Sequence, residues 1–216
     1  MNIFKNTVSD LLWEILIKLM AFEELNSFRL VGGTSLSLLL GHRISVDIDL
    51  FTDADYESID FNSIDRCLKN SFDYVSCISE GNDGMGKSYF IGNNEDDTVK
   101  LDVYYTDSFI FPQIEHGGLR LSHLEEIVAM KLEVIAIGGR KKDFWDIHEL
   151  MDHFSWNEML SFYEKRYPDG YSHKEIITKL KDFESADSDF DPVCLKGKYW
   201  ELIKLDIEES LNEYFR

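Results

Sequence analysis

Two aspartates near the start of the chain have the spacing of a metal-binding pair. Asp47 and Asp49 are separated by one residue in an extended, apolar segment. A strand would point both carboxylates to one side, while Val46, Ile48 and Leu50 pack behind them. Carboxylate oxygens suit a hard cation such as Mg²⁺, which commonly binds one or two carboxylates together with substrate phosphates. An Asp-x-Asp in an acidic surface loop is the alternative.

A glycine pair upstream predicts a phosphate-binding turn. Gly32 and Gly33 remove side chains where a phosphate could approach the backbone, and a helix starting near Thr34 would direct free N–H groups at that anion. The same residues could form a plain turn with a Thr N-cap. Together, the glycines and the aspartates favour metal-dependent nucleotidyl transfer, since buried aspartates need a compensating partner.

Four motifs in a fixed order resemble a known family. They comprise residues 31–38 (VGGTSLSL), residues 41–51 (GHRISVDIDLF), Lys131 within residues 130–133, and residues 140–147 (RKKDFWDI). This order resembles the AbiEii/AbiGii-type nucleotidyltransferase toxins, which belong to the DNA polymerase β-like nucleotidyltransferase superfamily. The resemblance runs from about residue 30 to residue 150.

The resemblance implies a role for each matching residue. The residues implied to bind the metal ion are Asp47, Asp49 and Asp102. Those implied to contact the nucleoside triphosphate are Gly32, Gly33, Thr34, Lys131 and Arg140. The implied catalytic set is Asp47, Asp49, Asp102, Lys131 and Asp143. The metal is expected to be Mg²⁺, with an NTP as substrate.

Several of these residues also have structural interpretations. Asp102 shares a strand face with Lys100 and Tyr104, and this face could simply be solvated. Lys131 could extend from an apolar stripe to water. Asp143 could be an N-cap, and the basic residues 140–142 could form an ordinary loop. Asp146 is expected to orient a neighbour.

The implied reaction transfers a nucleoside monophosphate from an NTP to an acceptor hydroxyl. By resemblance, the acceptor is the 3′ end of a tRNA, and the chain is the toxin of a toxin–antitoxin or phage-defence pair whose antitoxin is encoded by an adjacent gene. Protein side chains and small molecules such as aminoglycosides are alternative acceptors. A catalytically silent binding module is a further alternative.

Periodicity and turn residues predict the elements around these motifs. One helix is expected to begin at an N-cap at Ser9. A second is expected to begin at a capping box at Ser122 and to stop at Gly138 and Gly139. A hairpin is expected around residues 81–86, between strands at 74–80 and 88–92, followed by a strand at 99–105. The fold class is α/β (α+β), a polymerase β-like core with a mixed sheet flanked by helices. The core is expected over residues 1–150, and a helical C-terminal region packed on it over 151–216.

Composition limits the remaining possibilities. The 216 residues carry a formal charge of −19, so an RNA acceptor would have to be met by a local basic patch. With 44% hydrophobic and 13% aromatic residues the chain can bury a core. Three widely spaced cysteines indicate a reduced compartment, and neither a leader nor a membrane span is apparent. A cytoplasmic protein is expected.

Overall fold

Two compact units make up the chain, and each is described separately. The computed structural model describes residues 2–78 and 84–214. Unit 1 comprises Met1–Leu40 and Ser45–His123, and unit 2 comprises Gly41–Ile44 and Leu124–Arg216. This division differs from the domain boundary expected near residue 150, because helices α4 (Leu124–Ala136) and α5 (Lys141–Leu150) pack with the C-terminal helices. The domain assignment of 1–150 and 151–216 stays a prediction.

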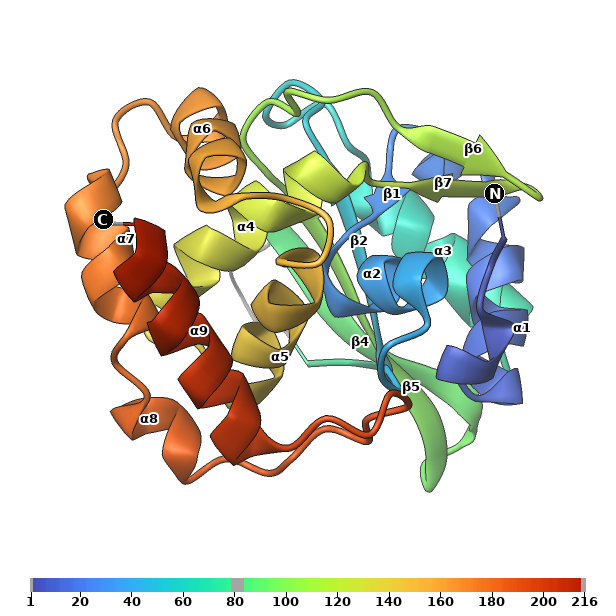
Figure 1. Ribbon diagram of the computed structural model, residues 1–216. Coiled ribbons are helices and arrows are strands. Elements are labelled where there is room, and N and C mark those ends of the chain that lie inside the picture. Colours follow the sequence, from blue (N-terminus) through green and yellow to red (C-terminus); the bar gives the residue numbers. More distant parts are fainter. Residues whose placement is uncertain (1, 79–83, 215–216) are drawn as a thin grey trace. The chain divides into compact units, whose positions relative to one another are not determined.

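Unit 1 is built on a mixed β-sheet (Figure 1). Among the described residues, seven strands pair in the order β3-β4-β5-β2-β1-β7-β6. Strand β2 is parallel to β5 and antiparallel to β1, and β1 is parallel to β7. The strands are β1 Arg29–Leu30, β2 Asp47–Thr52, β3 Tyr74–Cys77, β4 Gly86–Asn94, β5 Asp97–Tyr105, β6 Ile114–His116 and β7 Leu119–Leu121. The expected mixed α/β class is confirmed.

Short and long helices accompany this sheet. They are η1 Lys5–Thr7, α1 Asp10–Met20, η2 Glu23–Leu25, α2 Gly32–Leu40 and α3 Phe61–Ser71. Ser9 caps α1 as expected, because its hydroxyl accepts a hydrogen bond from Leu12 N at 3.1 Å. Asp60 caps α3 through Asn62 N and Ser63 N. Strands β3 and β4 are antiparallel, as the predicted hairpin requires, but its residues 79–83 lie outside the described residues.

The alternation of side chains along β2 and β5 separates two faces of the sheet. Ile48, Leu50, Leu101 and Val103 are fully buried in a core that also contains side chains of α1 and α3. The residues between them point to the other face and are only half-buried. Val46 does not join this core as expected. It is 66% exposed, because β2 begins only at Asp47.

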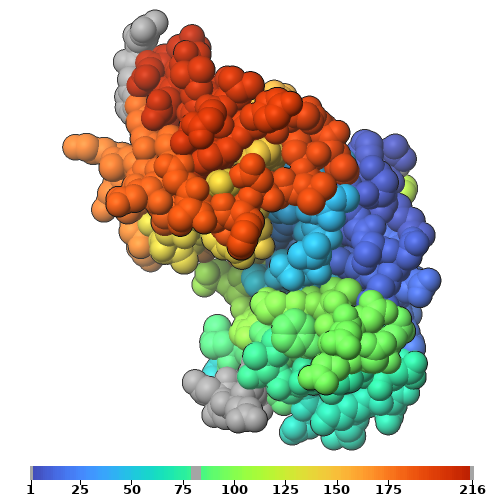
Figure 2. Space-filling view, turned by 90° about the horizontal axis from the view of Figure 1, so that it is seen from below, coloured from blue at the N-terminus to red at the C-terminus, as the bar shows by residue number. Residues whose placement is uncertain are grey.

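Unit 2 is helical in its described part. Its helices are α4 Leu124–Ala136, α5 Lys141–Leu150, α6 Trp156–Arg166, α7 His173–Leu180, α8 Glu184–Asp187 and α9 Trp200–Tyr214. Helix α4 contacts α5, α6 and α7, and α5 contacts α9. The yellow-to-red residues of this unit form one continuous surface in Figure 2. A capping box is present at Ser172 and Glu175, whereas the capping box predicted at Ser122 is wrong.

Ser122 fails as a cap because the strand pairing continues through it. Its backbone N–H donates to Leu30 O at 2.9 Å, which extends the β1–β7 ladder, and α4 begins two residues later. The buried Ser122 hydroxyl has no hydrogen-bond partner among the described residues. Gly138, with φ +114°, follows α4 as the predicted stop.

No helix in the described ranges 2–78 and 84–214 has the length and apolar character needed to span a membrane.

Arg120 on β7 ties three turns of unit 1 together. Its guanidinium donates to the carbonyl oxygens of Phe28, Met20 and Leu25 at 2.8, 2.9 and 2.9 Å. These three residues are buried, so the carbonyls have little access to replacement water.

We therefore expect Arg120→Met to lower the free energy of unfolding by about 2–4 kcal/mol, because three carbonyls lose a charged donor. Urea unfolding followed by circular dichroism measures the change. Arg66→Met is the matched control, since Arg66 is exposed and lies 3.6 Å from Asp60, and it should change stability by less than about 0.5 kcal/mol. Equal effects of the two substitutions would contradict the bracing role of Arg120.

Candidate active site

The face of the unit 1 sheet opposite its buried core carries three half-buried aspartates. Parallel pairing places Asp47 opposite Lys100 and Asp49 opposite Asp102. Neighbouring strands lie about 4.8 Å apart, so the Asp49 and Asp102 side chains leave the sheet side by side. The predicted common face of Lys100, Asp102 and Tyr104 is present, with Leu101 and Val103 buried opposite.

Asp102 is held by hydrogen bonds to both of its carboxylate oxygens. Ser88 Oγ on β4 donates to Oδ1 at 2.6 Å, and Lys100 Nζ donates to Oδ2 at 2.6 Å. Tyr104 OH lies 2.9 Å from Ser88 Oγ and completes the chain of hydroxyls. Partial burial would lower the pKa of Lys100, but Asp102, with Asp47 and Asp49, raises it. The alternative of a merely solvated face therefore does not describe Asp102.

Gly32 brings the start of helix α2 against Asp49. Its φ of +66° is in the left-handed region, and a Cβ atom added there would lie 2.7 Å from Asp49 Oδ2. Val31 N donates to Asp49 O at 2.9 Å, so backbone pairing fixes the same approach. A carboxylate beside a helix N-terminus is electrostatically favoured, and the same N–H groups can bind a phosphate.

The Thr34 side chain is used within the protein. Thr34 is 1% exposed, and its hydroxyl lies 2.7 Å from Ser45 Oγ and donates to the Asp47 carbonyl. The hydroxyl thus braces the backbone at the start of β2. Any contact of Thr34 with phosphate would fall to its backbone N–H.

Lys131 lies in a buried ion-pair cluster of unit 2. Its Nζ is 2.6 Å from Asp143 Oδ1 and 2.7 Å from Asp146 Oδ2, and the residue is 6% exposed. Burial alone would lower the pKa of Lys131, but Asp146 and Asp143 raise it. The alternative in which Lys131 extends to water is wrong, because α5 supplies two carboxylates beside it.

Asp143 joins this cluster from the first turn of α5. Arg140 is the N-cap of that helix, and Asp143, three residues further on, accepts a hydrogen bond from Arg140 N at 3.0 Å. The alternative role of Asp143 as the N-cap is therefore wrong in position. Its carboxylate satisfies the helix start with one oxygen and Lys131 with the other.

Asp146 accepts hydrogen bonds from donors on two other segments, residues 42–43 and helix α4. It accepts hydrogen bonds from His42 Nε2 at 2.8 Å and from Arg43 Nε and Nη2 at 2.6 and 2.8 Å, in addition to Lys131. Burial would raise the pKa of Asp146, but Arg43, Lys131 and His42 hold it well below its usual range. His42 and Arg43 lie inside the second sequence motif, yet no role was predicted for them, because their partner is about a hundred residues away.

The basic residues 140–142 are partly used in internal pairs. Arg140 Nε lies 3.1 Å from Asp189, and Lys141 Nζ lies 2.8 Å from Asp191. Lys141 is 6% exposed. Asp189 and Asp191 thus supply carboxylates to the basic residues 140–142. The two segments lie about fifty residues apart, so the sequence does not indicate that they pair.

The predicted site residues fall into two groups. Unit 1 holds Gly32, Gly33, Thr34, Asp47, Asp49 and Asp102, and unit 2 holds Lys131, Arg140 and Asp143. Hard oxygen donors in register on two parallel strands fit Mg²⁺ chemically. In the described part of the chain, however, no three or more His, Cys, Asp or Glu side chains are grouped as a metal site. The three-aspartate ligand set stays a prediction.

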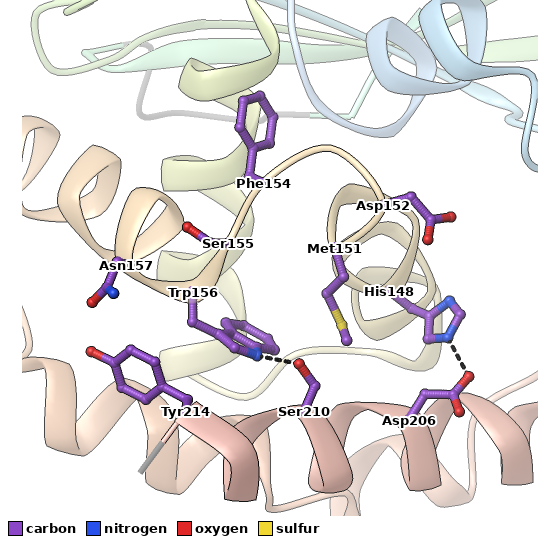
Figure 3. A pocket seen from close by; sticks show the side chains of 10 residues that line it. All are labelled: His148, Met151, Asp152, Phe154, Ser155, Trp156, Asn157, Asp206, Ser210 and Tyr214. Carbon is purple, nitrogen blue, oxygen red and sulfur yellow. Dashed lines mark hydrogen bonds and ion pairs between the residues drawn. The ribbon is translucent and has the colours of Figure 1, made fainter. Parts of the chain in front are cut away.

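A separate hollow lies in unit 2 (Figure 3). It has a volume of about 440 Å³ between α5, α6 and α9. The His148 ring donates to Asp206 at 2.8 Å, and the Trp156 indole donates to Ser210 at 2.8 Å, as drawn in Figure 3. None of the predicted site residues lines this hollow.

Comparison with known proteins agrees with the motifs. An uncharacterized protein of Aquifex aeolicus (strain VF5) is 28% identical, over 93% of this chain and 94% of its own. The solved structure of an H. pylori protein described as a nucleotidyltransferase has a TM-score of 0.59, with 19% identity over 93% of this chain and 90% of that chain. MenT4, a nucleotidyltransferase toxin from Mycobacterium tuberculosis H37Rv, also has a TM-score of 0.59, with 14% identity over 93% and 83%.

The two solved structures share the fold of this chain. The family described as "Nucleotidyl transferase AbiEii toxin, Type IV TA system" matches residues 14–213, which is nearly the whole sequence. The resemblance inferred from the four motifs is confirmed, and this chain belongs to the AbiEii nucleotidyltransferase toxin family.

Proposed function

We propose that this nucleotidyltransferase uses Mg²⁺ to transfer a nucleoside monophosphate from an NTP to the 3′ end of a tRNA, as a toxin opposed by an antitoxin. The observation that carries the proposal is the approach of Gly32 to Asp49, with Asp102 in register on the next strand. It puts a helix N-terminus suited to phosphate beside carboxylates suited to a cation. The cytoplasm, which supplies NTPs, is the expected location.

The site residues of unit 1 have different roles in the proposed reaction. The backbone N–H groups at Gly32 and Gly33 bind and orient the triphosphate. Asp47, Asp49 and Asp102 would hold the metal ion, which would neutralise charge on the phosphates. Asp102 accepts the proton of the acceptor hydroxyl as its oxygen attacks the α-phosphorus and pyrophosphate leaves. Ser88 holds one oxygen of the Asp102 carboxylate, and Lys100 pairs with the other oxygen in the nucleotide-free chain. Positioning and charge complementarity carry such a transfer.

The unit 2 residues serve this reaction less directly. Lys131 and Arg43 are compensated by Asp143 and Asp146, which makes the cluster close to neutral. We propose that Asp143 and Asp146 orient Lys131, and that Lys131 and Arg140 contact the nucleotide phosphates. The sequence resemblance supports this assignment, because Lys131 and Asp143 lie in the later segments that resemble the family, and the family match covers both residues.

The identity of the acceptor is the most specific element of the proposal. The family description names a nucleotidyl transferase toxin, and the tRNA acceptor is what the resemblance to such toxins implies. The pairing of Arg140 and Lys141 with Asp189 and Asp191 leaves this surface less basic than its sequence indicates. Protein and small-molecule acceptors are therefore tested in parallel.

The experiment incubates the full chain with each α-labelled NTP, Mg²⁺, and either total bacterial RNA, total protein or an aminoglycoside. We expect label in tRNA with the wild type and a loss of at least about 100-fold with Asp49→Asn, which keeps the side-chain shape. Label entering protein or the aminoglycoside instead would overturn the tRNA assignment. Full activity of Asp49→Asn would overturn the metal assignment.

Gly32→Ala tests the approach of helix α2 to the carboxylate. A methyl group there would displace Asp49 Oδ2, so transfer should fall about 100-fold. The matched control is Gly117→Ala, since Gly117 has φ +59° but nothing within 4 Å of its added Cβ. Both variants should lose about 1–2 kcal/mol of stability to backbone strain, and thermal unfolding measures this. Equal transfer rates in the two variants would refute the proposed geometry.

Asp146→Asn tests the buried cluster through pH. The variant leaves Arg43 and Lys131 short of one negative charge, so at pH 7 it should lose about 3–5 kcal/mol of stability. Because the pKa of Asp146 is depressed in the folded protein, this contribution is complete above about pH 4 and is lost as the pH falls further.

Urea unfolding of wild type and variant between about pH 7 and pH 3 measures the difference. The control is Asp152→Asn, because the Asp152 side chain is 68% exposed and lies 3.6 Å from Lys198. A difference between wild type and Asp146→Asn that does not shrink in acid would contradict the charge-based account.

A further inference from the structure

Lys100 lies among the three aspartates on the face of the sheet opposite the buried core. Lys100 is two residues before Asp102 on β5, so both side chains leave the same face. The β2–β5 register places Lys100 opposite Asp47. Its Nζ lies 2.6 Å from Asp102 Oδ2, which is a direct ion pair.

This ion pair occupies the oxygen that a metal ion at Asp102 would need. The other oxygen, Oδ1, accepts the Ser88 hydroxyl at 2.6 Å, so both oxygens of the carboxylate already have partners. A divalent cation and an ammonium group repel each other at such separations. Binding of the cation at Asp102 therefore favours departure of Lys100 from Oδ2.

We propose that Lys100 is a positioning residue that pairs with Asp102 until a nucleotide arrives, so that the divalent cation binds well only together with the nucleotide. The inference rests on the proposed function. Asp47, Asp49, Asp102 and Lys100 together carry a formal charge of −2. A bare divalent cation would displace the lysine without giving it a new partner, whereas a cation with a triphosphate supplies new anionic oxygens for the displaced ammonium.

Binding of Mn²⁺ to the nucleotide-free full chain tests this competition by titration calorimetry. Lys100→Met removes the charge and keeps much of the side-chain length, so Mn²⁺ should bind about tenfold tighter than to wild type. Lys100→Arg keeps the charge and should remain near wild type. An α,β-methylene NTP analogue, bound with Mn²⁺, should bind more weakly to Lys100→Met because the displaced ammonium is missing.

Unchanged, weaker or undetectable Mn²⁺ binding by Lys100→Met overturns the proposal. Lys100→Gln repeats the test if the Met variant does not fold, which circular dichroism reports. Asp49→Asn separates this result from the proposed function. If Asp49→Asn binds Mn²⁺ like wild type, the metal assignment itself fails. If Asp49→Asn loses binding while Lys100→Met matches wild type, only the role of Lys100 fails.

Discussion

The parallel pairing of β2 with β5 is the constraint on which the candidate site depends. Alternation along both strands buries Ile48, Leu50, Leu101 and Val103 in one core. The register then places the intervening polar residues together on the opposite face. A shift of one residue in either strand would bury aspartates and expose aliphatic side chains. Hydrophobic burial on one face therefore enforces the close approach of like charges on the other, and Lys100 offsets part of their repulsion.

Unit 2 contains buried ion pairs, unlike the half-buried carboxylates of unit 1. The charges of its buried clusters are removed from water, so each of these needs a partner with good geometry. Asp146 has His42, Arg43 and Lys131, and the buried Arg166 has Glu126. Removal of one member leaves the others uncompensated, which makes these positions less tolerant of substitution than the solvent-accessible carboxylates of unit 1. The half-buried carboxylates of unit 1 can instead exchange partners, as binding of a charged substrate requires.

Local patterns predicted much of this structure. The alternation of polar and apolar residues predicted that Asp47 and Asp49 share one face of their strand and that Asp102 lies on the polar face of its own. A serine before an apolar helical pattern predicted the cap at Ser9. Local patterns failed where a distant segment competes for the same groups. The backbone of Ser122 is taken by a strand, since Leu30 accepts its N–H. The sequence order of motifs identified the family but could not show that Lys131 is buried between two carboxylates.

Residues 41–44 connect helix α2 to the Asp47 strand, yet they pair with residues from the far end of the chain. Arg43 binds Asp146, Ile44 N donates to Val193 O, and Leu195 N donates to His42 O. During synthesis on the ribosome, this connection can acquire these contacts only after residue 195 has emerged. A truncated or still-growing chain lacks them even when all three aspartates of unit 1 have been made. The contacts of the segment that leads into the carboxylates therefore depend on residues 193–195, which are made long after the carboxylates themselves.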